Sequence, residues 1–214
     1  MQPTQEILRA LAARGLLLTQ DKSLPNVVTL LTGQSLRNSW WSHPKARLIF
    51  AVLSDLAQHP DVLFTKLLCG KVTLLHRRLW SPFLAVASAH EPWQLRGLSP
   101  KARGFLRTLK AKGSVQGSGA AVKELEGRLL ARTEEVHTES GRHEIRLEAW
   151  HVWSQRVGEK PVRSASQARR TLETAVRELG APLTALPWKS SCTRRLPLAW
   201  LTSSSNSPAV SLRS

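Results

Sequence analysis

Apolar residues recur every three to four positions over much of this chain, which is the spacing of a buried helix face. Residues 4–14 show the pattern in Ile7 and Leu11, with Thr4 placed to cap the helix and Gly15 placed to end it. The helix predicted over residues 99–112 has equally complete signals for its first and last turns. The same pattern predicts helices over residues 4–14, 25–31, 44–58, 77–89, 99–112, 120–130, 142–157 and 165–179.

For two of these predicted helices, the prediction rests on a set of apolar residues that would face the interior. The assigned inward faces are Ala46, Ile49, Phe50, Leu53 and Leu56 or Ala57 in residues 44–58, and Ile145, Ala149, Val152, Trp153 and Val157 in residues 142–157. Pro44 suits the first turn of the former helix. In the last helix, Ser164 and Gln167 form a predicted capping box.

Short β-prone runs lie between the predicted helices. Residues 62–68 and 71–75 are two such runs, and Cys69-Gly70 between them suits a tight hairpin turn. Residues 16–18 and 133–138 predict further short strands. Helices interrupted by short strand pairs predict an α-rich α+β fold with winged-helix-like modules and short β-hairpins.

Glycine and serine divide the chain into parts. Residues 113–119 read GSVQGSG, so we expect a flexible joint there. It would separate a winged-helix-like module with a basic hairpin, residues 1–113, from a helical or winged-helix-like module, residues 119–189. Residues 190–214 are rich in serine and hold no acidic residue, which predicts a mostly disordered tail. We find no internal repeat in the sequence.

The charge of the chain indicates what kind of partner the protein binds. The 214 residues hold 31 Lys and Arg against 15 Asp and Glu, a formal net charge of +16. Residues 44–112 hold 12 basic and 3 acidic residues, whereas residues 119–160 hold 7 and 8. Because like charges repel, such a field does not stabilise a fold, and its usual role is to attract a polyanion. We therefore expect a nucleic acid to be the partner.

Composition excludes several other classes. No run reaches about 18 apolar residues and residues 1–12 lack a signal-peptide pattern, so we expect neither a membrane span nor a secretory leader. Cys69 and Cys192 lack metal-type spacing and favour a reduced, cytoplasmic protein. Walker, Rossmann, paired CxxC and GxSxG patterns are missing from the sequence, so we predict no cofactor and no metal.

Two groups of cations are candidates for contact with phosphates. The first lies on the predicted hairpin and its exit, and the second lies on the helix over residues 99–112. For both groups the alternative is an ordinary solvated face, with lysine protecting a strand edge in the first. The candidates are Lys66, Lys71, His76, Arg77 and Arg78 in the first group, and Lys101, Arg103, Arg107 and Lys110 in the second.

Aromatic residues suggest a place for a base. In the run Trp40-Trp41-Ser42-His43-Pro44, two adjacent tryptophans cannot share a strand face, so one is expected to be presented. Trp41, with His43 beside it, would then stack on an unpaired or flipped base. The alternative is a packing corner that seats the helix over residues 44–58.

One short segment carries acid–base residues. Glu135, His137 and Glu139 would point the same way in a strand, as a proton relay or as metal ligands. No HExxH motif is present, and a solvated strand face explains the pattern equally well.

Several longer strings carry a family resemblance. They are Leu24-Pro25-Asn26, Ser39 to Pro44, Asp61 to Leu67, Gly70 to Thr73, His76 to Trp80, Glu134 to Gly141 and Leu186-Pro187-Trp188. With these, the chain from Leu24 to Trp188 resembles bacterial AlkZ-related proteins, relatives of winged-helix DNA glycosylases. The resemblance implies winged-helix modules and DNA contact. The Gln-x-Gln catalytic signature of those glycosylases does not occur here, so no catalytic residue is carried over.

Three hypotheses follow from the sequence. The leading one is a DNA-binding, repair-associated winged-helix protein that contacts phosphates through a basic surface. The second is a monofunctional DNA glycosylase acting on alkylated bases, with Glu135 or Glu139 and His137 positioning water. The third is a protein-interaction adaptor without DNA binding, which predicts partner binding that does not depend on salt.

Overall fold

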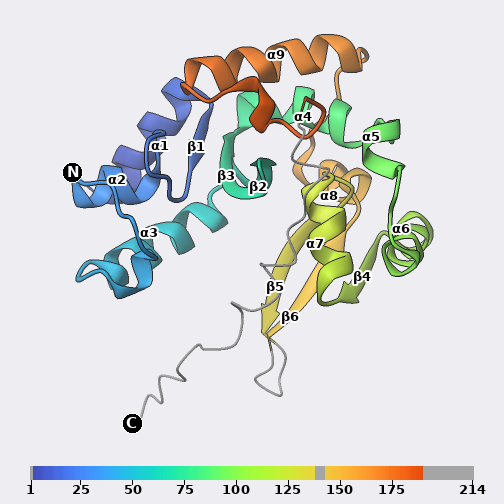
Figure 1. The fold of residues 1–214 in the computed structure, drawn as a ribbon, viewed down its shortest axis with the longest axis horizontal. Helices are drawn as coiled ribbons and strands as arrows, with labels where there is room; N and C mark the ends of the chain where they lie inside the picture. Colours follow the sequence, from blue (N-terminus) through green and yellow to red (C-terminus); the bar gives the residue numbers. More distant parts are fainter. Residues whose placement is uncertain (1, 138–142, 190–214) are drawn as a thin grey trace.

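A computed structural model of the chain describes residues 2–137 and 143–189 (Figure 1). For residues 135–137 and 143–144 it describes the backbone alone. Its first half is built around a three-stranded antiparallel sheet in the order β1-β3-β2. The elements of this half are α1 (Pro3–Arg14), β1 (Leu16–Leu18), α2 (Val27–Thr32), the short 3-10 helix η1 (Trp40–Ser42), α3 (Ala46–Gln58), β2 (Val62–Leu68) and β3 (Lys71–His76).

The second half holds another three-stranded antiparallel sheet, in the order β4-β6-β5. Helices connect the two sheets and follow the second one. The elements are η2 (Arg77–Leu79), α4 (Trp80–Ala87), α5 (Pro92–Leu95), α6 (Pro100–Lys112), β4 (Ser114–Gly117), α7 (Ala120–Gly127), β5 (Arg132–His137), β6 (His143–Glu148), α8 (Trp150–Val157), α9 (Ala165–Glu178) and η3 (Leu183–Ala185). The prediction of an α-rich α+β fold is confirmed.

The two halves repeat one order of elements, although the sequence shows no repeat. In each, a helix ends at a glycine in the left-handed conformation and leads directly into the first strand, with φ +80° at Gly15 and +77° at Gly113. One or two helices and a hairpin follow, and the last strand takes the centre of the sheet. The two halves share topology but not sequence. This is possible because buried positions accept many apolar side chains of similar volume. The winged-helix interpretation of this order stays a prediction.

The predicted hairpin turn is confirmed. Cys69 and Gly70 both have positive φ, +47° and +71°, which is the backbone of a two-residue turn whose twist matches the strands. Leu68 pairs with Lys71 across this turn, and Leu63 pairs with Leu75 farther along the ladder. The turn also contacts the end of the described chain, because the N–H of Cys69 donates to the carbonyl oxygen of Ala185 at 2.8 Å.

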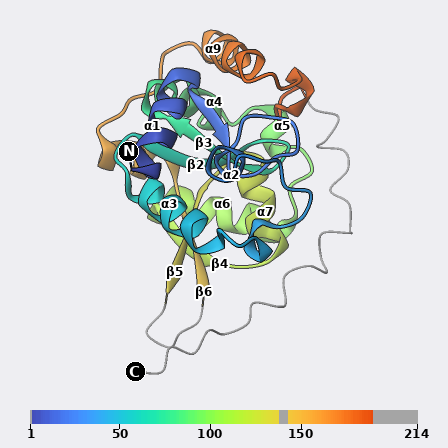
Figure 2. The same ribbon diagram turned by 90° about the vertical axis from the view of Figure 1, so that its left-hand side faces the viewer.

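The main hydrophobic core crosses the expected boundary at residue 113. Figures 1 and 2 both show α9 lying over α4, so α9 packs on a helix that precedes this boundary in the sequence. Phe83 of α4, Trp150 of α8 and Leu172 of α9 belong to one buried cluster with Leu16 of β1. The expected flexible joint at 113–119 is instead largely β4, which pairs with β6.

Three predictions from the hydrophobic pattern were wrong in detail. Residues 143–148 form the strand β6 rather than the first half of a helix, and Ile145 and Leu147 follow the strand alternation there. Phe50, assigned to the interior, is 54% exposed. Thr4 does not cap α1: Gln2 is the N-cap residue, and the Thr4 hydroxyl donates to Asp55 instead.

Candidate nucleic-acid interface

The lysine in the middle of the hairpin joins the two halves of the protein. Lys66 Nζ of β2 lies 2.6 Å from Glu126 Oε2 of α7, and the two side chains are only 29% and 14% exposed. Glu126 also accepts a hydrogen bond of 2.6 Å from the Thr133 hydroxyl. The charge of Lys66 is therefore largely neutralised inside the molecule, which reduces its attraction for a phosphate.

The second hairpin lysine is paired in the same way. Lys71 forms an ion pair with Asp21, whose carboxylate also accepts from the backbone N–H groups of Ser23 at 2.9 Å and Leu24 at 3.0 Å. Burial by itself would raise the pKa of Asp21, but these hydrogen bonds and the charge of Lys71 lower the pKa to about 2. Asp21 and Lys71 thus fix the loop before α2 to the hairpin.

The arginine that follows the hairpin lies between two acids. The guanidinium of Arg77 is 3.9 Å from Asp61 and 3.7 Å from Glu159, and it lies 5.7 Å from the ring centroid of Trp80. Because its side chain is 46% exposed, these pairs are loose and contribute little stability. Two nearby carboxylates nevertheless reduce its attraction for a phosphate.

His76 and Arg78 complete the first predicted group, and both support local structure. His76 caps η2 by accepting a hydrogen bond at Nδ1 from the N–H of Arg78, and burial lowers the pKa of His76. Arg78 donates to the carbonyl oxygen of Ala13 at the end of α1, at 3.0 Å. A Cβ at Gly15 would lie 2.9 Å from the Arg78 guanidinium, so the glycine makes room for it.

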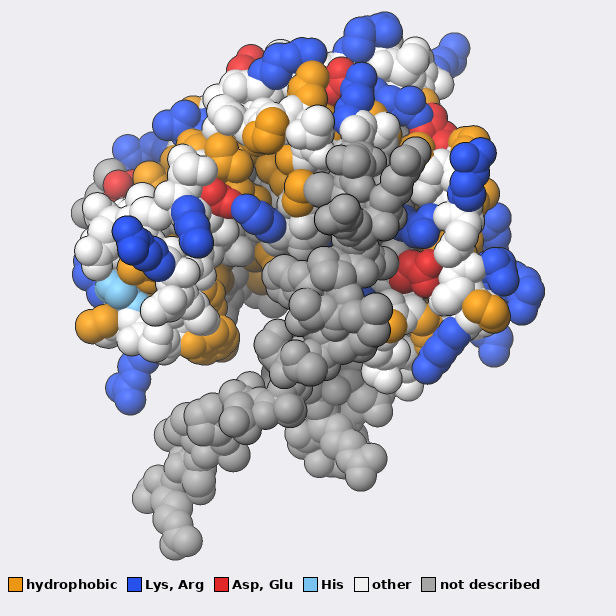
Figure 3. Space-filling view, viewed as in Figure 1, with side chains coloured by type: hydrophobic (Ala, Val, Ile, Leu, Met, Phe, Trp, Pro, Cys, Tyr) orange, Lys and Arg blue, Asp and Glu red, His pale blue; other side chains and the backbone are white. Residues whose placement is uncertain are grey.

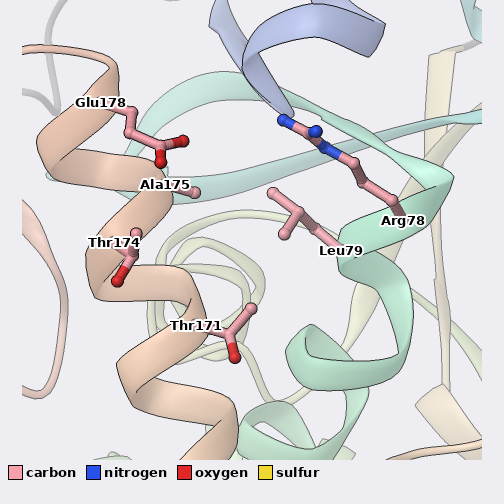
Figure 4. Close-up of a pocket in the computed structure, with 6 residues that line it drawn as sticks. All are labelled: Arg78, Leu79, Thr171, Thr174, Ala175 and Glu178. Atoms are coloured by element: carbon pink, nitrogen blue, oxygen red, sulfur yellow. The ribbon is translucent and has the colours of Figure 1, made fainter.

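Arg78 also borders an open hollow between η2 and α9. The hollow has a volume of about 410 Å³, and Figure 4 shows Arg78 and Glu178 on opposite sides of it. Its lining residues are Arg78, Leu79, Thr171, Thr174, Ala175 and Glu178. Glu178 puts an exposed carboxylate into this hollow, which makes it unfavourable for a phosphate.

The helix α6 differs from the hairpin, because its cations form no ion pair with any acidic side chain that the structure describes. The predicted signals are confirmed: the Ser99 hydroxyl accepts from the N–H of Ala102, Pro100 takes the first position and Gly113 ends the helix. Ala102, Leu106 and Leu109 face the second core cluster. This burial fixes the rotation of the helix and hence the direction of its charged positions.

Three of the α6 cations form one row. Arg103, Arg107 and Lys110 are at positions i, i+4 and i+7, within about 60° of one another around the helix. All three are exposed, and within the described residues none of them forms an ion pair. Arg103 donates to the carbonyl oxygen of Leu98 at 2.5 Å and keeps further N–H donors. Figure 3 shows Lys and Arg side chains gathered at this edge of the molecule, over α6.

Lys101 lies on the other flank of α6. Its ammonium is 5.9 Å from the ring centroid of Phe105, and the side chain is exposed. Helical spacing puts Lys112 on the same flank. The five cations of this helix therefore divide into a row of three and a separate pair.

Two histidines that the sequence did not single out lie beside the row. His90 follows α4 and His151 lies in the first turn of α8, and together with Lys110 they line one small pocket. Positions 90, 110 and 151 share no spacing and belong to different elements. No sequence pattern could have connected them, because only the packing of α4, α6 and α8 does so.

The aromatic candidates lie far from α6, on η1 (Figure 1). Trp41 is 62% exposed, but it stacks on Trp40 at 4.0 Å between ring centroids and contacts Phe50 of α3 at 5.8 Å. His43 is half-buried and accepts from the N–H of Lys45 at 3.1 Å. Trp41 is thus exposed to solvent, as expected for one of the two tryptophans. It also packs on α3, as the alternative of a packing corner predicted.

The acid–base candidates lie at the far end of the second sheet. Glu135 pairs with Ile145 and His137 pairs with His143 along the backbone ladder of β5 and β6. Glu139 lies outside the described residues. In the part of the chain that is described, no three His, Cys, Asp or Glu side chains gather as metal ligands, and no helix is both long and apolar enough to cross a membrane.

Comparison with known proteins does not assign this interface. No family model, curated protein or solved structure matches the chain. The resemblance to AlkZ-related proteins therefore stays a prediction from the sequence.

Proposed function

We propose that this protein binds nucleic acid, with duplex DNA as the expected partner, and that the row Arg103, Arg107 and Lys110 on α6 contacts the phosphates. The observation that carries the proposal is the difference between two sets of cations. Lys66, Lys71 and Arg77, in the hairpin and at its exit, form ion pairs with acidic side chains of the protein. The α6 row is exposed and has no acidic partner in the described residues.

The length of the row suits a phosphate backbone. Seven residues of α-helix rise about 10.5 Å, and duplex DNA carries about one negative charge per 1.7 Å of its axis. Three cations at this spacing therefore face several phosphates at once. The proposed contacts are to phosphates, which fix the position of the protein on the backbone and carry no sequence information directly.

The other parts of the leading hypothesis remain proposals with less support. A winged-helix role for the two sheet modules fits their repeated order of elements. The exposed surface at α3 includes aromatic side chains, with Phe50 of α3 54% exposed and Trp41 of η1 62% exposed. A role in DNA repair and a cytoplasmic location rest on the sequence alone. We give the glycosylase no catalytic residue.

Binding of the full-length protein to labelled duplex DNA across a salt series tests the proposal. Arg194, Arg195 and Arg213 are the cations of residues 190–214, and their combined replacement by alanine removes the same charge as a change of the α6 row. We expect a steep salt dependence that survives this replacement. Absence of binding at about 150 mM salt, where non-specific DNA binders still have Kd near 10⁻⁴–10⁻⁶ M, would favour the adaptor hypothesis.

A further inference from the structure

A small pocket opens beside the α6 row. It lies between the end of α4, the middle of α6 and the start of α8, and its volume is about 100 Å³. Leu106, Leu109, Leu130 and Ala149 form apolar walls. The pocket is lined by Ala87, Ser88, His90, Leu106, Leu109, Lys110, Leu130, Ala149, Trp150 and His151.

The titratable groups of this pocket are all basic. Its titratable lining residues are His90, Lys110 and His151, each from a different part of the chain, and no Asp or Glu lines it in the described residues. This distinguishes it from the hollow beside Arg78, which contains Glu178. Groups that become cationic, gathered without a counter-ion against apolar walls, are a site for an anion.

The backbone holds the two histidines in place. His90 has a φ of +49°, which is uncommon for a residue with a side chain and directs the chain from α4 toward α5. His151 is in the first turn of α8, whose N-cap Ala149 provides no side-chain hydrogen bond. The N–H groups of Val152 and Trp153 donate to the carbonyl oxygen of Ala149, at 3.0 and 3.1 Å, and the helix dipole is positive at this end.

We propose that this pocket binds one phosphate group, held by His90, Lys110 and His151, next to the row that contacts the nucleic-acid backbone. The proposal rests on the proposed function for the source of the phosphate. Lys110 belongs to both sites, so a strand that follows the row from Arg103 to Lys110 reaches the pocket. The phosphate is either an internal phosphodiester or a phosphorylated strand end.

The lowered pKa of His90 favours the neutral imidazole when no anion is bound, so phosphate binding at this site would include uptake of a proton. Partial burial of the ring, followed by the charge of Lys110, lowers the pKa of His90, while a backbone hydrogen bond at Ser88 opposes the shift. An anion in the pocket would offset the charge of Lys110 and so raise that pKa. Binding of phosphate is thus coupled to protonation of a specific imidazole.

A titration of the full-length protein with inorganic phosphate, followed by the imidazole NMR signals, tests the pocket without DNA. We expect saturable shifts at His90 and His151 and a higher pKa for His90 when phosphate is bound. Replacing His151 with glutamine should weaken phosphate binding about tenfold, the effect of one lost hydrogen bond to a charged group. His59→Gln, in the loop between α3 and β2, is the matched control and should change nothing.

A second arm identifies the source of the phosphate. An oligonucleotide duplex with a 5′-phosphate is compared with the same duplex ending in hydroxyl groups, for the unmodified protein and for His151→Gln. Tighter binding of the phosphorylated duplex that is lost in the variant indicates a strand end. Equal binding of both duplexes, weakened in the variant, indicates an internal phosphodiester, and either result supports the pocket.

The pocket and the proposed function fail in different ways. Salt-dependent DNA binding with unmoved histidine signals, and with full affinity in His90→Gln and His151→Gln, overturns the pocket and leaves the row in place. Saturable phosphate binding at the histidines without any DNA affinity overturns the nucleic-acid function. Because His90 and His151 are exposed, both substitutions should leave the fold intact, which a thermal melt checks.

Discussion

The α6 row makes a quantitative prediction about salt. In the variant Arg103→Ala/Arg107→Ala/Lys110→Ala, three proposed phosphate contacts are removed together. Each contact with B-DNA contributes about 0.9 to the slope of log K against log salt, so the slope should become shallower by about 2.7. Raising the salt from about 50 to 200 mM lowers the affinity of both proteins. The factor by which the affinity of the variant falls should be roughly 40 times smaller than the factor for the unmodified protein.

The structure indicates that this variant still folds. All three side chains are exposed, and alanine is the residue most favourable for a helix interior. The substitutions remove the hydrogen bond from Arg103 to the carbonyl oxygen of Leu98, which costs about 1 kcal/mol. Circular dichroism and a thermal melt would establish this before the binding is measured.

Fluorescence anisotropy on a labelled duplex, at five or more salt concentrations, measures the slope. The matched control removes three exposed arginines of α1 and α9, Arg9, Arg14 and Arg170, and should reduce the slope by much less. An α6 variant whose slope equals that of the unmodified protein would refute the assignment of the row. Equal decreases in both variants would show that the net charge, rather than a site, governs binding.

Further predictions concern the cations that we assign to structure and one close approach between α8 and the end of α6. Lys66→Ala should leave the salt slope unchanged and reduce the free energy of unfolding by about 1–3 kcal/mol, measured in urea, because Glu126 loses its partner. The pKa of Asp21 is lowered from 3.8 to about 2, so its carboxylate stabilises the fold above about pH 4, and this contribution, about 2 kcal/mol, is lost as the pH falls toward 2. Asp21→Asn should remove that part of the acid-unfolding curve, and an unchanged curve would contradict the ion pair. Gly113→Ala should lower the melting temperature, because the added Cβ would lie 2.7 Å from Val152 Cγ2 at a φ of +77°. A melting temperature equal to that of the unmodified protein would show that α8 shifts freely.

Local signals in the sequence determined much of the fold. The glycines at 15 and 113, the Ser99 cap and the Cys69-Gly70 turn act through the backbone of a few neighbouring residues, so their outcome is visible without tertiary structure. The helix predicted over residues 142–157 failed where the local signal was ambiguous. Ile145 and Leu147 alternate as in a strand, while Ile145 also matches the helical spacing of Ala149 and Val152. Pairing with β4 and β5 decided between the two.

For the candidate site, too, some features follow from local sequence and others only from the tertiary structure. Composition alone indicated a polyanionic partner, and the periodicity of residues 99–112 put cations on the outside of a helix. Only the tertiary structure decided which cations are available, because Lys66 and Lys71 are paired with acids 60 and 50 positions away in the sequence. The pocket of His90, Lys110 and His151 depends on packing in the same way. Local interactions follow from neighbouring residues, whereas charge pairing and pockets depend on which distant segments the core brings together.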